Sequence, residues 1–281
     1  MLIEKYIQEK SHLVDKRLKE LIPLNPGSLQ KELFEAANYS LHSGGKRLRP
    51  ILVFAALETF HEDPNVALDI ACAIEMIHTY SLIHDDLPCM DNDDMRRNKP
   101  SLHKAFSEWI ALLTGDYLLT YSFEVIANSH LSDAKKVKII SVIAHKIGAF
   151  GLIGGQYVDL SSENEKADWN KLEFMHINKT ASLFSACLEC SAIIADRNES
   201  EIRSLQNFGK NLGFAYQIVD DILDYETNDE EKATAVSILG FEEAKLKAEE
   251  LFEKALSSLS TLPLSTDLLK NLANMLIKRK S

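Results

Sequence analysis

The chain has 281 residues, 46% of them apolar, which is enough for a sizeable buried core. Its formal charge of -11, from 31 lysines and arginines against 42 aspartates and glutamates, argues against a nucleic-acid partner, because such proteins usually present a basic surface. The N-terminal segment is charged and amphipathic, unlike a signal peptide, and no run of about 18 uncharged apolar residues is present, so we expect a cytoplasmic protein without stable membrane insertion.

Apolar residues recur at helical spacing along most of the chain, as at Ile70, Ile74 and Ile77. Turn signals rich in glycine, proline and asparagine separate runs of roughly ten to thirty residues, which is long for strands and ordinary for helices. We therefore predict an all-α bundle of about ten or more helices without a β-sheet. Neither a repeat nor a low-complexity linker divides the chain, which predicts a single domain over residues 1–281.

The first candidate binding residues surround a glycine turn at Gly44 and Gly45. Lys46, Arg47 and Arg49 follow this turn directly. Arginine side chains and the backbone amides of glycine turns both bind phosphate oxygens. Taken singly, each of these cations is more often a surface residue that keeps a protein soluble, so their meaning depends on the acidic segments that follow.

The first acidic segment, residues 85–91, follows an apolar helical stretch. On an unbroken helix, the step from Asp85 to Asp91 would turn these two side chains away from each other. Pro88 removes a backbone donor and disfavours helix at the preceding residue, so we expect the helix to kink or end there. Asp91 would then swing back towards Asp85 and Asp86.

The second acidic segment predicts one polar face on a helix. Gln217, Asp220, Asp221 and Asp224 follow steps of three and four residues, so this face presents an amide and three carboxylates. Two charges about 4 Å apart repel by roughly 4 kcal/mol at an effective dielectric constant of about 20, so each acidic segment should attract a cation. Magnesium suits such segments because it takes one or two carboxylates and fills its shell with water and phosphate. Solvated helix ends are the alternative, although the apolar approach to each segment favours the mouth of a core.

Further cations indicate a phosphate ligand. Arg96 and Arg97 follow the first acidic segment, and Lys179 and Thr180 interrupt an apolar helix. Arginines that grip phosphate oxygens, together with aspartates that hold magnesium on the same group, would bind a polyphosphate.

Two other motifs suggest competing sites. Cys187 and Cys190 have the spacing of a redox or metal pair, but they lie in an apolar run without a second pair, and we expect buried thiols. The pattern Glu-x-x-His occurs at residues 75–78 and 173–176, as in helical di-iron proteins. Such sites need two further glutamates, which we do not find in matching helices.

These motifs resemble, in kind and in order, those of the trans-isoprenyl diphosphate synthases of the farnesyl and geranylgeranyl type. The similarity covers most of the chain, and the insertion between Asp86 and Asp91 is typical of the bacterial and plastid branch. The matching segments are Gly44 to Pro50, Ile77 to Ser81, Asp85 to Arg97, Gly115 with Asp116, Gly154 to Gln156, Lys179 with Thr180, and Phe214 to Asp224. The resemblance implies an isoprenoid synthase fold, in which a helical bundle surrounds a central cavity.

The resemblance also implies a role for each site residue. Magnesium, about three ions per site, would be bound by Asp85, Asp91 and Asp220, with support from Asp86, Asp221 and Asp224. The allylic diphosphate would contact Arg96, Lys179, Thr180, Gln217 and Lys232, and isopentenyl diphosphate would contact Lys46, Arg49, His78 and Arg97. The catalytic set would be Asp85, Asp86, Asp91, Arg96, Lys179 and Asp220. Because the family is usually homodimeric, we expect a homodimer, with long apolar helices such as residues 109–126 as candidates for its interface.

The helix before Asp85 carries the prediction of product length. Ser81 lies one turn before Asp85 on the same face, and Tyr80 lies beside Ser81, so the Tyr80 ring could limit the growing chain. Ordinary core packing is the other role open to Tyr80. We expect farnesyl diphosphate, made from isopentenyl diphosphate and dimethylallyl or geranyl diphosphate, with geranylgeranyl diphosphate as the alternative product.

One departure from the family pattern bears on activity. Residues 225–231, which separate Asp224 from Lys232, are fewer than in the family's glycine-containing loop, and an additional lysine is missing. A non-catalytic or regulatory subunit that binds prenyl diphosphates is therefore an alternative, and a terpene cyclase is another. A cyclase would not need the cations for isopentenyl diphosphate, and the retained aspartates favour an active enzyme. Asn98 also stands where the family usually has a glycine.

Overall fold

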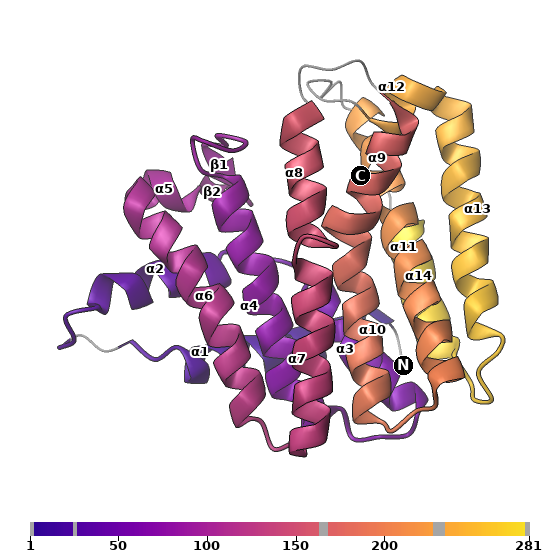
Figure 1. Ribbon diagram of the computed structural model, residues 1–281, viewed down its shortest axis with the longest axis horizontal. Helices are drawn as coiled ribbons and strands as arrows, with labels where there is room; N and C mark the ends of the chain where they lie inside the picture. Colours follow the sequence, from indigo (N-terminus) through magenta and orange to yellow (C-terminus); the bar gives the residue numbers. More distant parts are fainter. Residues whose placement is uncertain (1–2, 25–26, 163–167, 227–233, 279–281) are drawn as a thin grey trace. The chain divides into compact units, whose positions relative to one another are not determined.

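The computed structural model describes residues 3–24, 27–162, 168–226 and 234–278. The chain divides into two compact units, one formed by Met1–Phe54 and Pro64–Lys136 and the other by Ala55–Asp63 and Val137–Ser281. Helices make up most of the described chain in each unit (Figure 1), so the prediction of an all-α protein is confirmed. The single domain expected over residues 1–281 stays a prediction, since one domain can contain two such units.

The first unit is built on α4, Leu68–Asp85, which is buried on almost every side and packs against α1, Ile3–Leu21, and α6, Glu108–Asn128. The His84 ring occupies the space beside Gly115 of α6, where an added Cβ would lie 2.0 Å from the His84 Nε2 atom. Glycine at this position therefore lets the two helices pack. The other elements of the unit are α2 (Lys31–Leu41), a 3-10 turn (Pro64–Ala67), β1 (Met95–Arg96), β2 (Lys99–Pro100), α5 (Leu102–Ala105) and the first parts of α3 (Leu48–Thr59) and α7 (Asp133–Ile147).

The second unit is built on the long helix α11, Glu199–Glu226, which packs against α10, Ser182–Ile194, and α13, Phe241–Leu259 (Figure 1). Leu205, Phe208 and Leu212 are fully buried, as their helical spacing predicts. The remaining elements are α8 (Leu152–Ser162), α9 (Trp169–Met175), a π-helical turn (His176–Ala181), α12 (Ala235–Leu239) and α14 (Asp267–Ile277).

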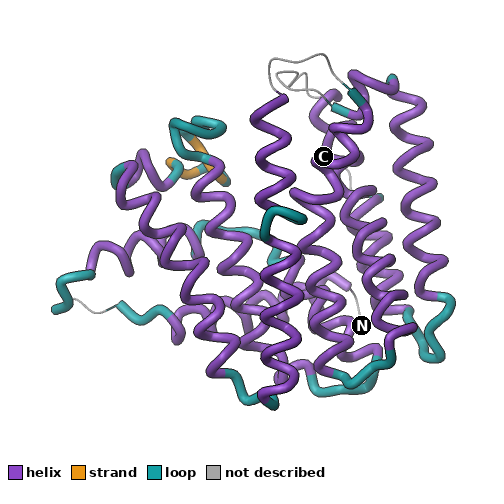
Figure 2. Tube along the Cα trace, viewed as in Figure 1, coloured by secondary structure: helices purple, strands orange, loops and turns teal. Residues whose placement is uncertain are grey.

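A short β-hairpin corrects the prediction that the chain has no sheet (Figure 2). β1 and β2 pair antiparallel, with Arg96 opposite Lys99. The two turn residues, Arg97 and Asn98, have φ angles of 53° and 62°, the left-handed geometry of a tight hairpin turn. Asparagine tolerates this geometry better than most residues do, so Asn98 can take the place of the glycine that the family pattern expects.

Three helical segments are long and apolar enough to cross a membrane by length and composition, namely Pro64–Asp85, Glu108–Asn128 and Asp133–Ser162. Each of these segments contains charged residues, so none is an uncharged apolar run. In Pro64–Asp85, 72% of the apolar window is buried inside the protein, so its hydrophobic residues serve the core. The absence of stable membrane insertion stays a prediction.

Candidate functional site

The first acidic segment turns back on itself as Pro88 predicts. α4 ends at Asp85, and Pro88 lies exposed in the turn that follows. The backbone amide of Asp91 donates a hydrogen bond of 2.8 Å to the carbonyl of Asp85. The two outer aspartates of the segment are therefore neighbours, although an unbroken helix would have separated their side chains.

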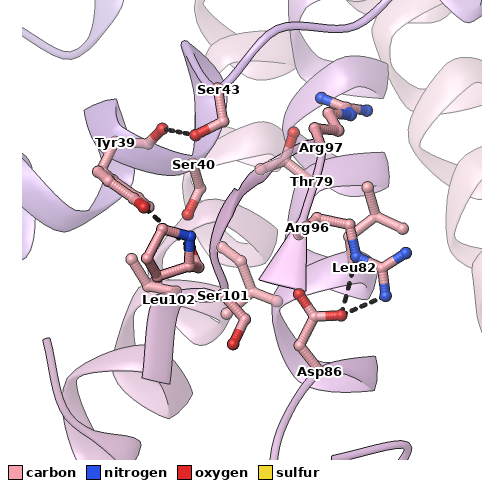
Figure 3. A pocket seen from close by; sticks show the side chains of 12 residues that line it. Tyr39, Ser40, Ser43, Thr79, Leu82, Asp86, Arg96, Arg97, Ser101 and Leu102 are labelled. Atoms are coloured by element: carbon pink, nitrogen blue, oxygen red, sulfur yellow. Dashed lines mark hydrogen bonds and ion pairs between the residues drawn. The ribbon is translucent and has the colours of Figure 1, made fainter. Parts of the chain in front are cut away.

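Asp86, between these two, is turned towards protein cations. Its side chain is buried, and the Arg96 guanidinium donates from both Nε, at 2.9 Å, and Nη2 to the same carboxylate oxygen (Figure 3). Burial raises the pKa of Asp86 above its ordinary value, and the hydrogen bond from Arg96 offsets part of this effect. Arg96 also donates to Asp93 at 2.8 Å. The structure thus gives Asp86 and Arg96 a shared role in fixing the hairpin that the sequence does not reveal.

A small pocket of about 30 Å³, lined by both polar and apolar side chains, lies beside this ion pair (Figure 3). A pocket of this size holds about one water molecule, so it is too small for a prenyl chain. The Tyr39 hydroxyl donates to the carbonyl of Pro100 at 2.8 Å and ties α2 to β2. The lining residues are Tyr39, Ser40, Ser43, Thr79, Leu82, Ile83, Asp86, Arg96, Arg97, Pro100, Ser101 and Leu102.

A cluster of cations surrounds His78 in the same unit. Burial lowers the pKa of His78 well below its ordinary value, and the positive charges of Arg49, Arg97, Arg47 and Arg96 lower it further. Burial also lowers the pKa of Arg97, and Arg47 and Arg49 act in the same direction, whereas Glu75 opposes them. Such a concentration of positive charge around a neutral imidazole suits a multiply charged anion.

Gly45 is required by the way Arg97 lies over the glycine turn. The Arg97 Nη1 atom donates to the carbonyl of Gly44. Gly45 has a φ of +124°, and an added Cβ would lie 2.8 Å from Arg97 Nη1. The turn at residues 44–49 and the hairpin arginine are therefore assembled together, as the combination of these motifs predicts.

Tyr80 and Ser81 lie on the buried part of α4. The Tyr80 side chain is 4% exposed, and its hydroxyl has no hydrogen-bond partner among the described residues. Burial, with a smaller effect from Asp85, raises the pKa of Tyr80 to about 12. Ser81 donates to the carbonyl of His78 at 2.9 Å. Both residues are thus part of the interior of this unit, which fits the predicted place of Tyr80 and also fits core packing.

The second acidic segment lies on α11 as predicted, but its three aspartates differ in surroundings. Asp221 is buried, and its Oδ2 atom accepts hydrogen bonds from the backbone amide of Ala235, at 2.7 Å, and pairs with His176 Nε2 at 3.0 Å. Asp220 is half-buried and Asp224 is exposed. Asp221 therefore joins α11 to α12 and to the π-helical turn, and its support of magnesium stays a prediction.

The π-helical turn presents the predicted Lys179 and Thr180 towards two neighbouring helices of the second unit. Lys179 Nζ donates to Asp159 of α8 at 2.7 Å, and the Thr180 hydroxyl donates to Gln217 of α11 at 3.0 Å. An added Cβ on Gly155 would lie 2.4 Å from the backbone nitrogen of Lys179, so α8 can approach this turn only with a glycine there. π-helical turns frequently mark functional sites.

Sequence reasoning did not assign a role to Gln156 or Asp159. Gln156 is 6% exposed, and neither its amide oxygen nor its amide nitrogen has a partner among the described residues. Buried amides without partners are rare in proteins, and they point to a bound water or ligand. Gln156 and Asp159 are three residues apart, which places them on one face of α8. This spacing, next to Gly154 and Gly155, could have indicated from the sequence that both belong to the site.

The described residues bring the backbones of the two outer aspartates of the first acidic segment together, without a complete metal cage. They include no group of three or more histidines, cysteines, aspartates or glutamates that could enclose a metal. Magnesium needs only one or two carboxylates when phosphate completes its shell, so a turn that joins the backbones of Asp85 and Asp91 is compatible with this mode of binding, and the metal ligands stay a prediction. Lys232 lies outside the described residues, as does most of the shortened segment 225–231.

The competing sites are occupied by other interactions. Glu75 accepts from Arg47 at 2.8 Å, and His176 pairs with Asp221, so both Glu-x-x-His motifs are engaged within their own units. Cys187 and Cys190 are fully buried free thiols, as predicted. Burial raises the pKa of Cys190 well above its ordinary value, which makes this thiol unreactive.

The family model and several relatives in sequence and in structure point to one group of enzymes. The family model for polyprenyl synthetases matches residues 30–271. The chain is 41% identical over 270 residues to the farnesyl diphosphate synthase of Bacillus subtilis, covering 90% of each chain. It is 42% identical over 269 residues to a chloroplastic protein of Arabidopsis thaliana, the large subunit 1 of a heterodimeric geranylgeranyl pyrophosphate synthase, covering 89% of this chain and 72% of that one. A crystal structure of an FPP/GFPP synthase from Zymomonas mobilis superposes with a TM-score of 0.91 at 36% identity, covering 98% of both chains.

Proposed function

The chain belongs to the polyprenyl synthetase family, and on this premise we propose that it joins isopentenyl diphosphate to dimethylallyl or geranyl diphosphate, with farnesyl diphosphate as the main product. The observation that carries the proposal is the pairing of opposite charges in the first unit. The turn that brings Asp85 and Asp91 together follows α4, the helix that carries His78. The cations around His78 come from the hairpin after that turn, Arg96 and Arg97, and from the segment after the glycine turn, Arg47 and Arg49. Such an arrangement suits a metal-bound diphosphate beside a second diphosphate.

In this proposal, about three magnesium ions would be held by phosphate oxygens and by the carboxylates of Asp85, Asp91 and Asp220. Asp224 would support these ligands. When bound, magnesium would neutralise the charge that develops on the departing diphosphate. Asp86 and Asp221 would act through the protein, because each is already held by protein donors. Arg96 and Lys179 would contact the allylic diphosphate, as would Thr180, Gln217 and Lys232.

The second substrate would be held by Lys46, Arg49, Arg97 and His78. Because its pKa is low, His78 would stay neutral and donate a hydrogen bond to the diphosphate without adding to the repulsion among the arginines. The cations would hold the diphosphate of isopentenyl diphosphate still while its double bond faces the allylic carbon.

The chemical step would begin when the bond between the allylic carbon and the diphosphate oxygen breaks. The cations and the hydrogen-bond donors would stabilise the charge on this leaving group more in the transition state than in the ground state. The double bond of isopentenyl diphosphate would then attack the allylic cation to form the new carbon-carbon bond. A proton would leave to the released diphosphate, which restores a double bond in a product longer by one five-carbon unit.

The proposal also specifies the chain length of the product. The buried ring of Tyr80 favours the fifteen-carbon product in our interpretation, because a bulky side chain on α4 would limit the space for a longer chain. Relatives named for geranylgeranyl diphosphate synthesis are as similar as those named for farnesyl diphosphate synthesis, so the twenty-carbon product is the second candidate.

A homodimer is proposed from the exposed apolar residues of α6. Trp109 is 63% exposed, and Leu112 and Leu113 are exposed on the same helix. Exposed apolar residues that gather in this way usually mark an interface. Size-exclusion chromatography with light scattering would test the oligomeric state, and the variant Leu113→Glu should weaken a dimer.

A cytoplasmic location stays part of the proposal.

One assay tests the function. Purified protein would be incubated with magnesium, isopentenyl diphosphate and either dimethylallyl or geranyl diphosphate, and the products would be identified by chain length. We expect the fifteen-carbon product. A twenty-carbon product would favour the second candidate, no condensation would favour a non-catalytic subunit, and cyclised hydrocarbon would favour a terpene cyclase.

A further inference from the structure

Arg47 differs from the two cations on either side of it. Lys46 is exposed and Arg49 is half-buried, whereas Arg47 is 3% exposed. Its φ of 49° is left-handed, which is uncommon for an arginine and costs backbone energy. This backbone geometry turns the middle cation of the glycine turn away from solvent, and the surrounding structure must compensate for it.

Each of the three guanidinium nitrogens of Arg47 donates to a protein acceptor. Nε donates to Asp15 of α1 at 2.8 Å, Nη1 donates to Glu75 of α4 at 2.8 Å, and Nη2 donates to the carbonyl of Leu41 at the end of α2. Glu75 is itself 2% exposed. The guanidinium thus connects three helices of the first unit at one point, and its donors serve the protein.

The same contacts tie the glycine turn to His78. Glu75 precedes His78 by one turn of α4, so both side chains lie on the same side of that helix. The turn receives two further contacts, from Arg97 to the carbonyl of Gly44 and from the Ser11 hydroxyl to the carbonyl of Lys46, at 3.4 Å. Of the three side chains that hold the turn, Arg47, Arg97 and Ser11, Arg47 donates a hydrogen bond to a residue of α4, Glu75.

We propose that Arg47 is a positioning residue for isopentenyl diphosphate, which with Glu75 and Asp15 holds the glycine turn so that Lys46 and Arg49 lie beside His78. This inference rests on the proposed function. It separates the two roles of the cations after the glycine turn. Lys46 and Arg49 bind the substrate, and Arg47 sets where they stand.

General stabilisation does not explain the buried pair by itself. Replacement of a buried ion pair by apolar side chains of similar size is often neutral or stabilising, because charges lose their hydration when they are buried. A planar guanidinium that donates in three directions does, however, define one geometry, which an apolar cluster does not. The pair is therefore best explained by the position that it imposes on the turn.

The test compares the two substrates in steady-state kinetics. In Arg47→Met and Arg47→Lys, the KM for isopentenyl diphosphate should rise about tenfold or more, because its ligands are misplaced, while the KM for geranyl diphosphate stays within about twofold. The matched control is Arg17→Met. Arg17 also joins α1 to α4, through a hydrogen bond of 2.8 Å to Asp69, but it does not contact the glycine turn, and its loss should leave both KM values unchanged.

A second variant separates position from stability. Arg47→Met combined with Glu75→Leu replaces the buried pair by apolar side chains, and its melting temperature should recover relative to Arg47→Met. The inference holds if the KM for isopentenyl diphosphate stays raised in this double variant. It is overturned if that KM returns to the wild-type value, if both KM values rise equally, or if neither changes in Arg47→Met. Absence of turnover in the wild-type protein would overturn the proposed function, and this inference with it.

Discussion

The two acidic segments begin with the same pair of aspartates, yet the protein holds the second aspartate of each pair in a different way. Asp86 is gripped by the guanidinium of Arg96, 10 residues further along the chain. Asp221 is held by the backbone amide of Ala235, 14 residues away, and by the ring of His176, 45 residues away. One carboxylate is thus fixed by a charged partner from a neighbouring hairpin, and the other by donors from two separate helical segments.

Burial of the second aspartate is thus shared by the two segments, whereas the chemical nature of its partners is not. In both segments, a buried carboxylate anchors the backbone from which the first aspartate projects. In the first unit, the anchor forms where the chain returns after a short hairpin. In the second unit, the anchor depends on packing between α11, α12 and the π-helical turn. Four predictions test how far this comparison extends.

The largest effect is expected where the two segments should be equivalent. Asp85→Ala and Asp220→Ala each remove a proposed magnesium ligand, so each should lower kcat at least about 1000-fold, since the charge on the leaving diphosphate loses its main stabilisation. Steady-state assays and circular dichroism would measure activity and folding. Asp133→Ala is the control, because the Asp133 side chain is 99% exposed. Retention of more than about a tenth of the activity in either variant would contradict the assigned roles.

The second aspartates should respond differently from each other. Asparagine keeps an acceptor oxygen at both positions but removes the negative charge. Asp86→Asn should lower the free energy of unfolding by about 2 kcal/mol, because its partner Arg96 is always charged, whereas Asp221→Asn should cost about 1 kcal/mol, because a backbone amide and a histidine ring need only an acceptor. Asp93→Asn, which affects the more exposed contact of Arg96, should cost less than about 0.5 kcal/mol. Urea unfolding would give the three values. The comparison fails if the loss at Asp221 equals or exceeds the loss at Asp86.

Product length should depend on the helix before the first segment alone. Tyr80→Ala should lengthen the products because it removes a buried ring five residues before Asp85, and chromatography of the products would show the shift. Tyr80→Phe keeps the ring and removes a buried hydroxyl without a described partner, so the products should stay the same. Tyr216→Ala makes a similar change before Asp220 and should not alter length. Unchanged products in Tyr80→Ala would leave core packing as the role of this ring.

The smallest effect concerns acid sensitivity, which should arise in the first unit. The pKa of His78 is far below its ordinary value of about 6.5, so below that pH the unfolded chain takes up a proton that the folded protein rejects. Stability is therefore full above about pH 6.5 and falls as the pH decreases. In His78→Gln, the loss of unfolding free energy between pH 7.5 and pH 5.5 should be smaller than in the wild type by about 1 kcal/mol. An equal loss in both proteins would show that His78 accepts a proton without cost.

Local rules predicted several features of the site correctly. Pro88 ends the helix that carries Asp85, and the spacing of Gln217, Asp220 and Asp224 places them on one face of α11, because both depend on neighbouring residues only. The hairpin was missed because its turn, Arg97 with Asn98, lacks the Asn-Gly signature of such turns.

The amino-acid sequence alone was enough to predict the helical class, the family and the acidic and basic residues proposed to contact each diphosphate. Those features follow from spacing and from motif order along the chain. The packing of the helices adds that Arg96 holds Asp86, that Ala235 and His176 hold Asp221, that Arg47 is buried against Glu75, and that Lys179 is held by Asp159. The physical reason is that a buried charge needs a specific partner, and that partner is brought close by the packing of helices rather than by its distance along the chain.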